Sequence, residues 1–594
     1  MAIITKQSSP AYRQDTGEEN KGFPASHISG IAVILAILLI RFFRTIVFGK
    51  SISKLFLLGH WDPCFFAFRA GQNFLVDGSL LLLHMPYRFF VAQCWRHAIP
   101  LWNNLSGFGM PLLADPQAFV LSPLYAIFFA FPTMYVWNQT IIIELAIGAI
   151  STYLLCLELD FGFIAALSSG LLFSFCPWVQ WQGELIGNGI CLTPFVFLFF
   201  VKAARHRALF YTIIAGIAAA VDLLAAHPEM SLMTIIFAVA LMYISTYKQS
   251  PANFSLFNIF YRIGLSGLVA FGLAAPLLIP FAEYLLNGYT YKLCGVAPAN
   301  ITWQALLANY FYPFHTEGNL FWGPLSWLGL AGLIFLPFRQ TRFAISILVC
   351  FILSILATAK VFPLNILFSV APFSYVESIY CLPEYVVFVS ILSGIGIGSL
   401  ITYSKNSTRK RLLAFVFLAM VPAVVSALLS QWHPIDSWIR TDQAANFRQF
   451  SWKFWSTNTY CLAGLLFVWA LIRNQHLALK ASLKHLSIIA FTILGVWNLF
   501  FISRNALPIR PSFNYPQISP IQIDKDSRFL TVGSHLFRHN TGLIYQMHNV
   551  QTHNPLLPNN FVEYMEACGA QVNDRFSQIF SPMISRKIDV TGTS

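Results

Sequence analysis

The chain has few charged residues. Only 10% of its 594 residues are Asp, Glu, Lys or Arg, whereas an ordinary soluble domain carries about 25%. A soluble fold of this length could not cover its surface with so few charges, so a soluble globular enzyme is excluded. With 57% hydrophobic residues and 57 Phe, the composition instead suits a protein whose outer surface faces lipid.

Cysteine patterns are also lacking. The ten Cys are scattered, with no CxxC pair and no Cys/His ligand set, so the sequence supports neither a disulfide framework nor a zinc site. Acids are scarce as well, and the net charge is +13. The basic residues cluster in short stretches between apolar runs, which is typical of cytoplasmic loops rather than of nucleic-acid binding. We therefore expect no nucleic-acid partner.

Apolar runs dominate the chain. A spanning helix needs about 20 mostly apolar residues, and about thirteen runs approach that length. These runs cover residues 28–48, 138–157, 162–179, 187–203, 208–226, 229–247, 259–283, 320–337, 343–359, 384–403, 411–430, 457–472 and 485–502. Two further runs, 118–136 and 360–375, are broken by Pro and polar residues, and we interpret them as re-entrant or interfacial. The sequence predicts an all-α polytopic membrane protein with about 11–14 transmembrane helices.

Basic residues set the predicted orientation. Loops rich in Lys or Arg fall on one side of a thirteen-span arrangement, and the positive-inside rule places that side in the cytoplasm. These loops contain residues 202–207, 248, 339–342, 405–411 and 473–484. A second basic group conflicts with the rule, because it follows the first apolar run on the predicted outer side. Its members are Arg41, Arg44, Lys50 and Lys54.

This orientation divides the chain into three parts. We expect a cytoplasmic tail over residues 1–27 and a membrane domain over 28–502, whose first outer loop is 49–137. Residues 503–594 would form a small extracytoplasmic α/β region, because turn residues and short β-rich runs such as 528–532 predict strands there. No internal repeat stands out.

The first outer loop carries a dense series of motifs. In chain order these are Asp62-Pro, Asp77-Gly, Pro86-Tyr-Arg88, Pro100-Leu-Trp102-Asn103 and Ala114-Asp115-Pro-Gln117. In this order the loop resembles the first extracytoplasmic loop of the YfhO-type bacterial membrane protein family. Similar stretches follow downstream at 226–229, 319–325 and 554–558.

The resemblance implies a fold and an activity. The family is placed with the GT-C membrane glycosyltransferases, which implies a GT-C-like bundle, a sugar donor carried on a polyprenyl phosphate and catalysis by an acid in the first outer loop. Two features depart from the pattern. The family often has Arg where this chain has Cys381-Leu-Pro383-Glu384, and family tails usually continue beyond a position like Ser594. The C-terminal region is therefore expected to be shortened.

Acids in the first outer loop are the candidate catalysts. Attack of an acceptor hydroxyl on an anomeric carbon needs a base, whose help is worth roughly 10²–10⁴-fold. We expect Asp77 to be this base, with Asp62 and Asp115 as alternates. Each acid also has a structural interpretation, because Asp before Gly or Pro favours a turn.

Basic and polar residues around the loop are the candidate binding groups. Arg88 and Arg96 are expected to face the anionic leaving phosphate, although Arg88 could instead reach lipid headgroups. His227, Glu229 and Glu184 would lie at the outer mouth of the bundle, where they either bind donor phosphate, substrate or metal, or stabilise helix starts. No metal ligand is assigned, and a divalent cation, Mg²⁺ or Mn²⁺, stays open as a cofactor.

These features favour an integral membrane glycosyltransferase of a bacterial cytoplasmic membrane. Its partners would be a polyprenyl-phosphate-linked sugar, a glycan or glycolipid acceptor from the cell envelope, and the lipid bilayer. Two other classes stay open. One is a transporter or flippase for lipid or polysaccharide, and the other is a non-catalytic membrane protein of envelope assembly.

Overall fold

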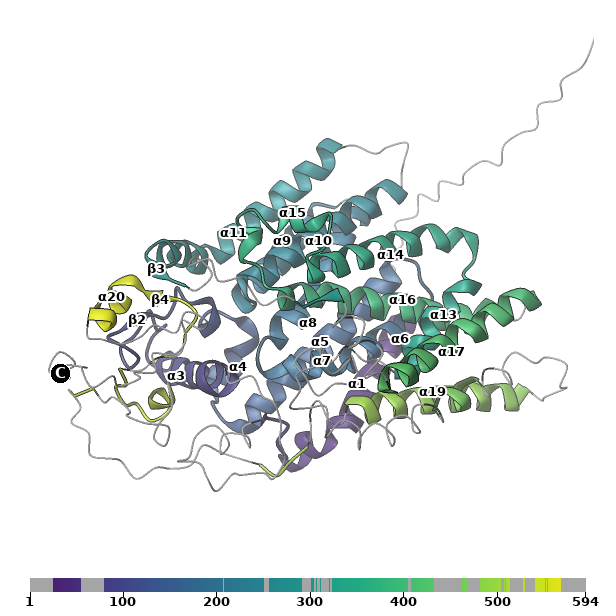
Figure 1. The fold of residues 1–594 in the computed structure, drawn as a ribbon, viewed down its shortest axis with the longest axis horizontal. Helices are drawn as coiled ribbons and strands as arrows, with labels where there is room; N and C mark the ends of the chain where they lie inside the picture. Colours follow the sequence, from purple (N-terminus) through teal and green to yellow (C-terminus); the bar gives the residue numbers. More distant parts are fainter. Residues whose placement is uncertain are drawn as a thin grey trace, which may run out of the picture.

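The computed structural model describes most of the helical part of the chain. The described residues are 25–54, 79–206, 208–249, 256–290, 301–303, 306, 310, 320, 323–403, 408–431, 459, 461–466, 469, 481–503, 507, 509–512, 527–528, 540–550, 552 and 554–567. Long helices run side by side along the long axis, and short strands and helices gather at one end (Figure 1). The protein is a helical membrane protein.

The long helices follow the apolar runs. They are α1 Ala25–Phe48, α5 Met134–Glu158, α6 Phe163–Ser174, α8 Gly187–His206, α9 Leu209–Ala225, α10 Pro228–Gln249, α11 Leu256–Leu286, α13 Gly323–Gly332, α14 Phe338–Ala359, α16 Leu382–Tyr403, α17 Arg409–Gln431 and α19 Ala481–Ser503. Every run predicted to span overlaps a helix. In run 457–472 the described residues, 459, 461–466 and 469, are all helical. Run 162–179 is divided between α6 and α7 Pro177–Trp181, because Pro177 begins a new helix.

Not every predicted span is long enough by itself. Among the described residues, six helices have the length and hydropathy to cross a membrane, and the bent pair 163–174 and 177–184 makes a seventh. Helix α9, the stretch 343–359 of α14 and the segment 323–335 are apolar but shorter. The two Pro-broken runs form no membrane-length helix. Run 118–136 holds α4 Ala126–Ala130 between short turns, and run 360–375 holds α15 Leu364–Leu367.

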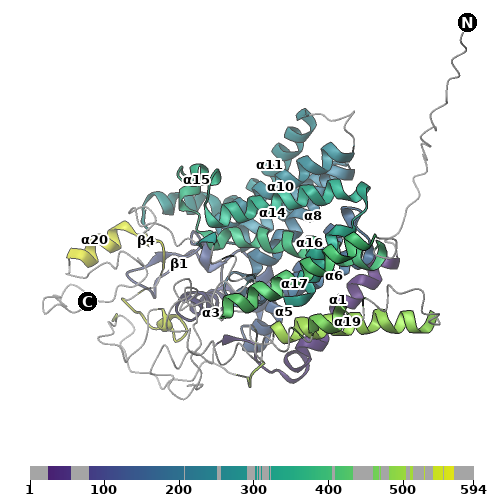
Figure 2. The same cartoon turned by 45° about the vertical axis from the view of Figure 1, so that its right-hand side comes forward.

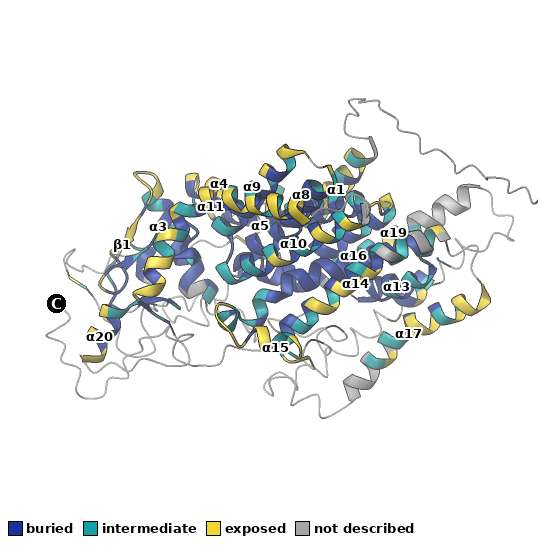
Figure 3. Cartoon of the chain, turned by 90° about the horizontal axis from the view of Figure 1, so that it is seen from above, coloured by how far each residue is buried: buried dark blue, intermediate teal, exposed yellow. Residues whose placement is uncertain are grey.

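Helix α16 forms the centre of the bundle. In its most apolar stretch 89% of residues are buried, against 22% in α1 and in α11, so α1 and α11 present apolar side chains outward (Figure 3). Glycines bring α13 against α16: a Cβ at Gly329 or Gly332 would lie under 2.5 Å from a backbone oxygen of α16. Small residues of this kind allow close helix packing where lipid supplies no hydrophobic drive.

Segments far apart in sequence meet at one end of the bundle. Strands β1 Trp102–Asn103 and β2 Met110–Pro111 form an antiparallel hairpin, and β3 Gly288–Tyr289 pairs with β4 Leu557–Pro558, which precedes α20 Asn559–Ala567. Single bridges join Ser51 to Arg510 and Ser106 to Asn549. The first outer loop, the end of α11 and the C-terminal tail therefore share one end (Figures 1 and 2). We call the described residues 79–133, 287–290 and 507–567 the outer layer.

The predicted domain boundaries and membrane side stay predictions. The run 528–532, predicted as a strand, lies largely outside the described residues. The basic residues after the first span, which conflicted with the positive-inside rule, have contacts of their own. Arg41 Nη2 donates to the carbonyl oxygen of Leu507 at 2.9 Å. Lys54 is buried, and its Nζ lies 3.8 Å from the centroid of the Trp181 ring. Internal contacts thus account for two of the four.

Candidate functional site

The candidate acids differ in what the structure says of them. Asp62 and Asp77 lie outside the described residues, between Lys54 and Ser79. Asp115 is described and buried. The geometry of the site is therefore given by Asp115 and by the residues that flank the segment 55–78.

Asp115 joins the outer loop to the C-terminal tail. Its Oδ1 accepts a hydrogen bond from the backbone N–H of Gln117 at 2.9 Å, and its Oδ2 accepts one from Asn554 Nδ2 at 2.6 Å. Asn554 Nδ2 also donates to the hydroxyl of Tyr87 at 3.2 Å. Burial raises the pKa of Asp115 to about 6, since the charged form is disfavoured away from water. Its carboxylate thus joins the outer loop to the C-terminal tail, and it caps the short helical turn Pro116–Ala118.

Arg88 points into the molecule rather than out of it. It lies on α3 Met85–Trp95 and is fully buried. Its Nη1 and Nη2 donate to the carbonyl oxygens of Glu184 and Leu185, each at 2.8 Å. Its guanidinium carbon lies 4.8 Å from the ring of Phe119 and 4.4 Å from that of Tyr125. Burial lowers the pKa of Arg88.

Arg96 has the opposite setting. It lies at the C-terminal cap of α3 and is exposed. The structure therefore does not bring the two predicted phosphate-binding arginines together. Of the two, Arg96 is the one free to meet an anion from solvent, while both terminal nitrogens of Arg88 are already donating to backbone carbonyls.

His227 contacts the outer layer through aromatic rings. It is 6% exposed and precedes Pro228 at the start of α10. Its ring lies 4.9 Å from Tyr380, 6.0 Å from His84 and 6.2 Å from Phe119, measured between centroids. Because Phe119 also covers Arg88, His227 and Arg88 belong to one cluster. Glu229 follows in the first turn of α10, where a carboxylate stabilises the helix dipole.

Glu184 is buried between the bundle and the outer loop. It ends the turn Gln182–Glu184 after α7. Its Oε1 accepts from Trp137 Nε1 at 3.0 Å and its Oε2 from the backbone N–H of Lys54 at 2.8 Å. Of the outer-mouth residues, it is therefore the one that contacts the start of the loop directly.

Further buried polar residues lie within the bundle. Glu144 on α5 and Asn188 on α8 are buried, and among the described residues neither side chain has a hydrogen-bond partner. Arg88 lies close enough to interact electrostatically with Glu144. Glu384 accepts from Thr234 at 3.0 Å, and Asp222 is fully buried on α9. A lone acid within an apolar run was the available signal, because such residues are costly in a membrane.

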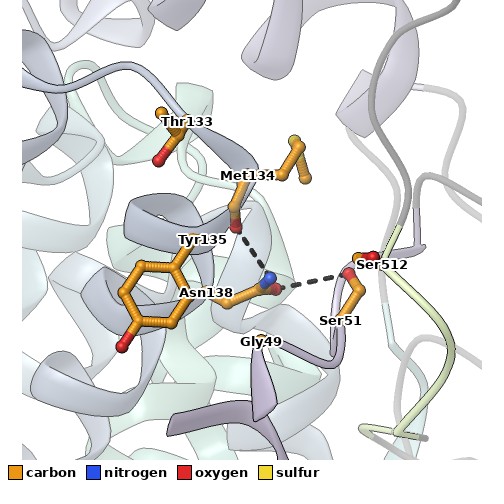
Figure 4. Close-up of a pocket in the computed structure, with 7 residues that line it drawn as sticks. All are labelled: Gly49, Ser51, Thr133, Met134, Tyr135, Asn138 and Ser512. Carbon is orange, nitrogen blue, oxygen red and sulfur yellow. Dashed lines mark hydrogen bonds between the residues drawn. The ribbon is translucent and has the colours of Figure 1, made fainter. Parts of the chain in front are cut away.

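A cavity of about 370 Å³ opens beside the start of the outer loop (Figure 4). Asn138 is its most constrained side chain: Nδ2 donates to the carbonyl of Met134 at 2.7 Å, and Oδ1 accepts from the N–H of Ile52 at 3.2 Å. The cavity is lined by Gly49, Ser51, Thr133, Met134, Tyr135, Asn138 and Ser512. None of these described lining residues is an acid or a base, so they supply no group for proton transfer.

No metal site is evident in the part of the chain that is described. No three His, Cys, Asp or Glu side chains there are placed to hold a metal ion. The involvement of Mg²⁺ or Mn²⁺ stays a prediction.

Comparison with solved structures finds twelve matching chains, among them ArnT and AftD. No protein-family model matches the chain, and no curated protein matches it. ArnT from Cupriavidus metallidurans, solved with undecaprenyl phosphate bound, is 10% identical with a TM-score of 0.45, over 88% of this chain and 85% of ArnT. The arabinofuranosyltransferase AftD from Mycobacteria is 14% identical with a TM-score of 0.37, over 68% of this chain and 26% of AftD. At these TM-scores neither similarity assigns an activity to this chain.

Proposed function

We propose that the protein is a GT-C-type integral membrane glycosyltransferase. It would move a sugar from a polyprenyl-phosphate donor to a cell-envelope acceptor at the outer face of a bacterial cytoplasmic membrane. One observation carries the proposal: the first outer loop and the tail close into a single layer on the end of a membrane bundle, with Asp115 and Asn554 2.6 Å apart. The resemblance of the loop motifs to the YfhO-type family supplies the reaction class.

The location suits the chemistry. A lipid-linked sugar has its reactive carbon at the membrane boundary, and a glycan acceptor approaches from water. In the proposed reaction the acceptor hydroxyl oxygen bonds to the anomeric carbon while the bond from that carbon to the phosphate oxygen breaks. The hydroxyl proton passes to the base, and polyprenyl phosphate leaves. Asp77 is the proposed base, with Asp62 and Asp115 as alternates.

Binding groups for the donor follow from exposure. The leaving phosphate is anionic, and charge-assisted hydrogen bonds from a guanidinium would stabilise it. The exposed Arg96 is the proposed contact, whereas Arg88 is proposed to shape the site through the carbonyls of residues 184 and 185. Among the outer-mouth residues, His227 contributes the edge of the same cluster.

Sugar transfer in isolated membranes tests the proposal. Polyprenyl-phosphate sugars carrying a radiolabel would be offered to membranes containing the wild-type protein, Asp77→Ala, Asp62→Ala or Asp115→Asn. We expect Asp77→Ala to lower turnover by roughly 10²–10⁴-fold, as for loss of a general base. Full turnover in Asp77→Ala with loss in Asp62→Ala would move the base to Asp62. No transfer by the wild-type protein with any donor would overturn the proposal.

Buried acids in the membrane helices favour a transporter or flippase as the second candidate. Glu144, Asp222 and Glu384 are each fully or almost fully buried on α5, α9 and α16, and acids at such depth often mark substrate or proton pathways. A fluorescent polyprenyl phosphate in liposomes distinguishes the two. Movement between leaflets that depends on the protein and is unaffected by Asp77→Ala would favour transport.

A further inference from the structure

One residue of the bundle contacts the chain on both sides of the segment 55–78. Glu184 Oε2 accepts the backbone N–H of Lys54 at 2.8 Å, and the carbonyl oxygen of Glu184 accepts Arg88 Nη1 at 2.8 Å. Lys54 directly precedes the segment. Arg88 follows it in the first turn of α3, after the π-helical turn Leu80–His84. The segment itself carries Asp62 and Asp77.

We propose that Glu184 is a positioning residue, which fixes both flanks of the acid-bearing segment at one place on the bundle. The inference rests on the proposed function, since it assigns Glu184 a part in that reaction. It differs from the predicted outer-mouth role, because both carboxylate oxygens of Glu184 are hydrogen-bonded to the protein. Glu184 would thus act through the loop and would not touch the donor.

Glu184 is itself held rigidly. It is fully buried, and Trp137 Nε1 on α5 donates to its Oε1 at 3.0 Å. The next residue, Leu185, receives the second Arg88 hydrogen bond at 2.8 Å. Asn138 lies one helical turn after the start of α5, and its Oδ1 accepts a hydrogen bond from the backbone N–H of Ile52 at 3.2 Å. The start of the loop is therefore attached at two neighbouring points, Ile52 and Lys54.

The electrostatic setting explains why an acid occupies this position. A fully buried carboxylate is costly unless cations and donors compensate it. Lys54 and Arg88 are both buried beside Glu184: Lys54 Nζ donates to the carbonyl of Trp181, and Arg88 interacts electrostatically with Glu184. A glutamine at position 184 would keep the size of the side chain but lose its charge. Its amide nitrogen cannot accept a hydrogen bond, so either the Lys54 N–H or Trp137 Nε1 would lose its acceptor.

Position matters for the reaction because the base must meet the acceptor hydroxyl in the right geometry. A displacement of about 1 Å from a distant change can lower the rate by about 10²-fold. Donor binding would be little affected, since Glu184 makes no contact with the proposed donor groups. We therefore expect Glu184→Gln to lower kcat roughly 10- to 100-fold with the donor KM within about threefold of wild type.

Two measurements test the inference in lipid nanodiscs. The first is kcat and donor KM for wild type, Glu184→Gln and Trp137→Phe, which removes one hydrogen bond to Glu184 but keeps an aromatic ring. The second is amide hydrogen exchange of the stretch 51–54, where the Lys54 amide should exchange at least about tenfold faster in Glu184→Gln. Ser326→Ala is the control, since it removes a buried hydroxyl pair with Ser393, at 2.9 Å, remote from the loop.

The outcomes separate the two proposals. If the wild-type protein transfers no sugar, the proposed function fails, and the exchange of the Lys54 amide still tests the anchoring. A drop in kcat in Glu184→Gln, smaller in Trp137→Phe and absent in Ser326→Ala, supports positioning. Wild-type kcat and wild-type exchange in Glu184→Gln overturn it. Equal losses of kcat and thermal stability in Glu184→Gln and Ser326→Ala overturn it too, since they indicate a general structural role.

Discussion

The two ends of the helical bundle hold their connecting segments in different ways. At the outer layer, buried hydrogen bonds join residues more than 400 positions apart, such as Ser106 to Asn540 at 3.1 Å and Asp115 to Asn554 at 2.6 Å. At the opposite end, one ion pair and one histidine–glutamate hydrogen bond join the α5–α6 connection to the α8–α9 connection. Arg205 pairs with Asp160, and His206 lies 2.9 Å from Glu158.

This difference in contacts indicates which end of the bundle holds its side chains in a fixed geometry. Buried hydrogen bonds to charged groups are strong, and losing one partner leaves the other unsatisfied. Exposed ion pairs contribute little, because water and salt screen them. A site that needs fixed geometry is therefore better built at the outer layer than at the end of the bundle that carries Arg205 and His206.

Removing the charge from Arg88 should have the largest effect on stability. Arg88→Leu would leave the carbonyls of Glu184 and Leu185 without their donor, and would leave Glu144 without its nearby cation. We expect a loss of about 3–5 kcal/mol, as for one partner taken from a buried charged group. Thermal unfolding in detergent measures it.

The matched control for this prediction lies on the same helix. Arg96→Leu changes an exposed arginine at the end of α3 and should alter the free energy of unfolding by about 0.5 kcal/mol or less. If both variants lose the same stability, the comparison between buried and exposed contacts fails.

The sequence predicted the helices well because lipid imposes a length and an apolar composition on each of them. Runs such as 187–203 and 384–403 coincide with α8 and α16 to within a few residues. The break at Pro177 was missed, because run 162–179 was predicted as one span although proline begins a new helix there. The short length of α13 was not predicted, because the apolar run 320–337 continues past Gly332, where the α-helix ends.

The site was less predictable because its contacts link distant positions. Nothing local in Pro86-Tyr-Arg88 indicates that the guanidinium donates to carbonyls 96 and 97 residues away. The link from Asp115 to Asn554 spans 439 residues. Glu144 could have been singled out, since it is a lone acid in an apolar run, and a buried acid in a membrane helix needs an explanation.

Titration of Asp115 should give a moderate effect at the outer layer. Burial raises its pKa to about 6 in the folded protein from the ordinary value of 3.8, so folding favours its protonated form. Its contribution to stability is fully present below pH 3.8 and is lost as the pH rises through 6. Between pH 5 and pH 7 the loss should be about 1 kcal/mol.

Thermal unfolding at pH 5 and pH 7 measures this contribution in wild type and in Asp115→Asn. The asparagine has no carboxyl to titrate, so the variant should lack that part of the pH dependence while keeping the remainder. An identical pH dependence in both proteins would show that another group titrates over this range.

The smallest effect on stability is expected at the end of the bundle opposite the outer layer. Arg205→Ala removes the ion pair with Asp160. The Arg205 side chain is 15% exposed and the Asp160 side chain 75% exposed. Because water reaches the carboxylate, the free energy of unfolding should fall by only about 0–1 kcal/mol, and less at high salt. Sugar transfer should be unchanged, because the pair lies at the opposite end from the outer layer. Asp160→Ala tests the same pair from its other side. A loss of several kcal/mol in either variant would mean that this end is held as firmly as the outer layer, and the contrast between the two ends would no longer explain where the site lies.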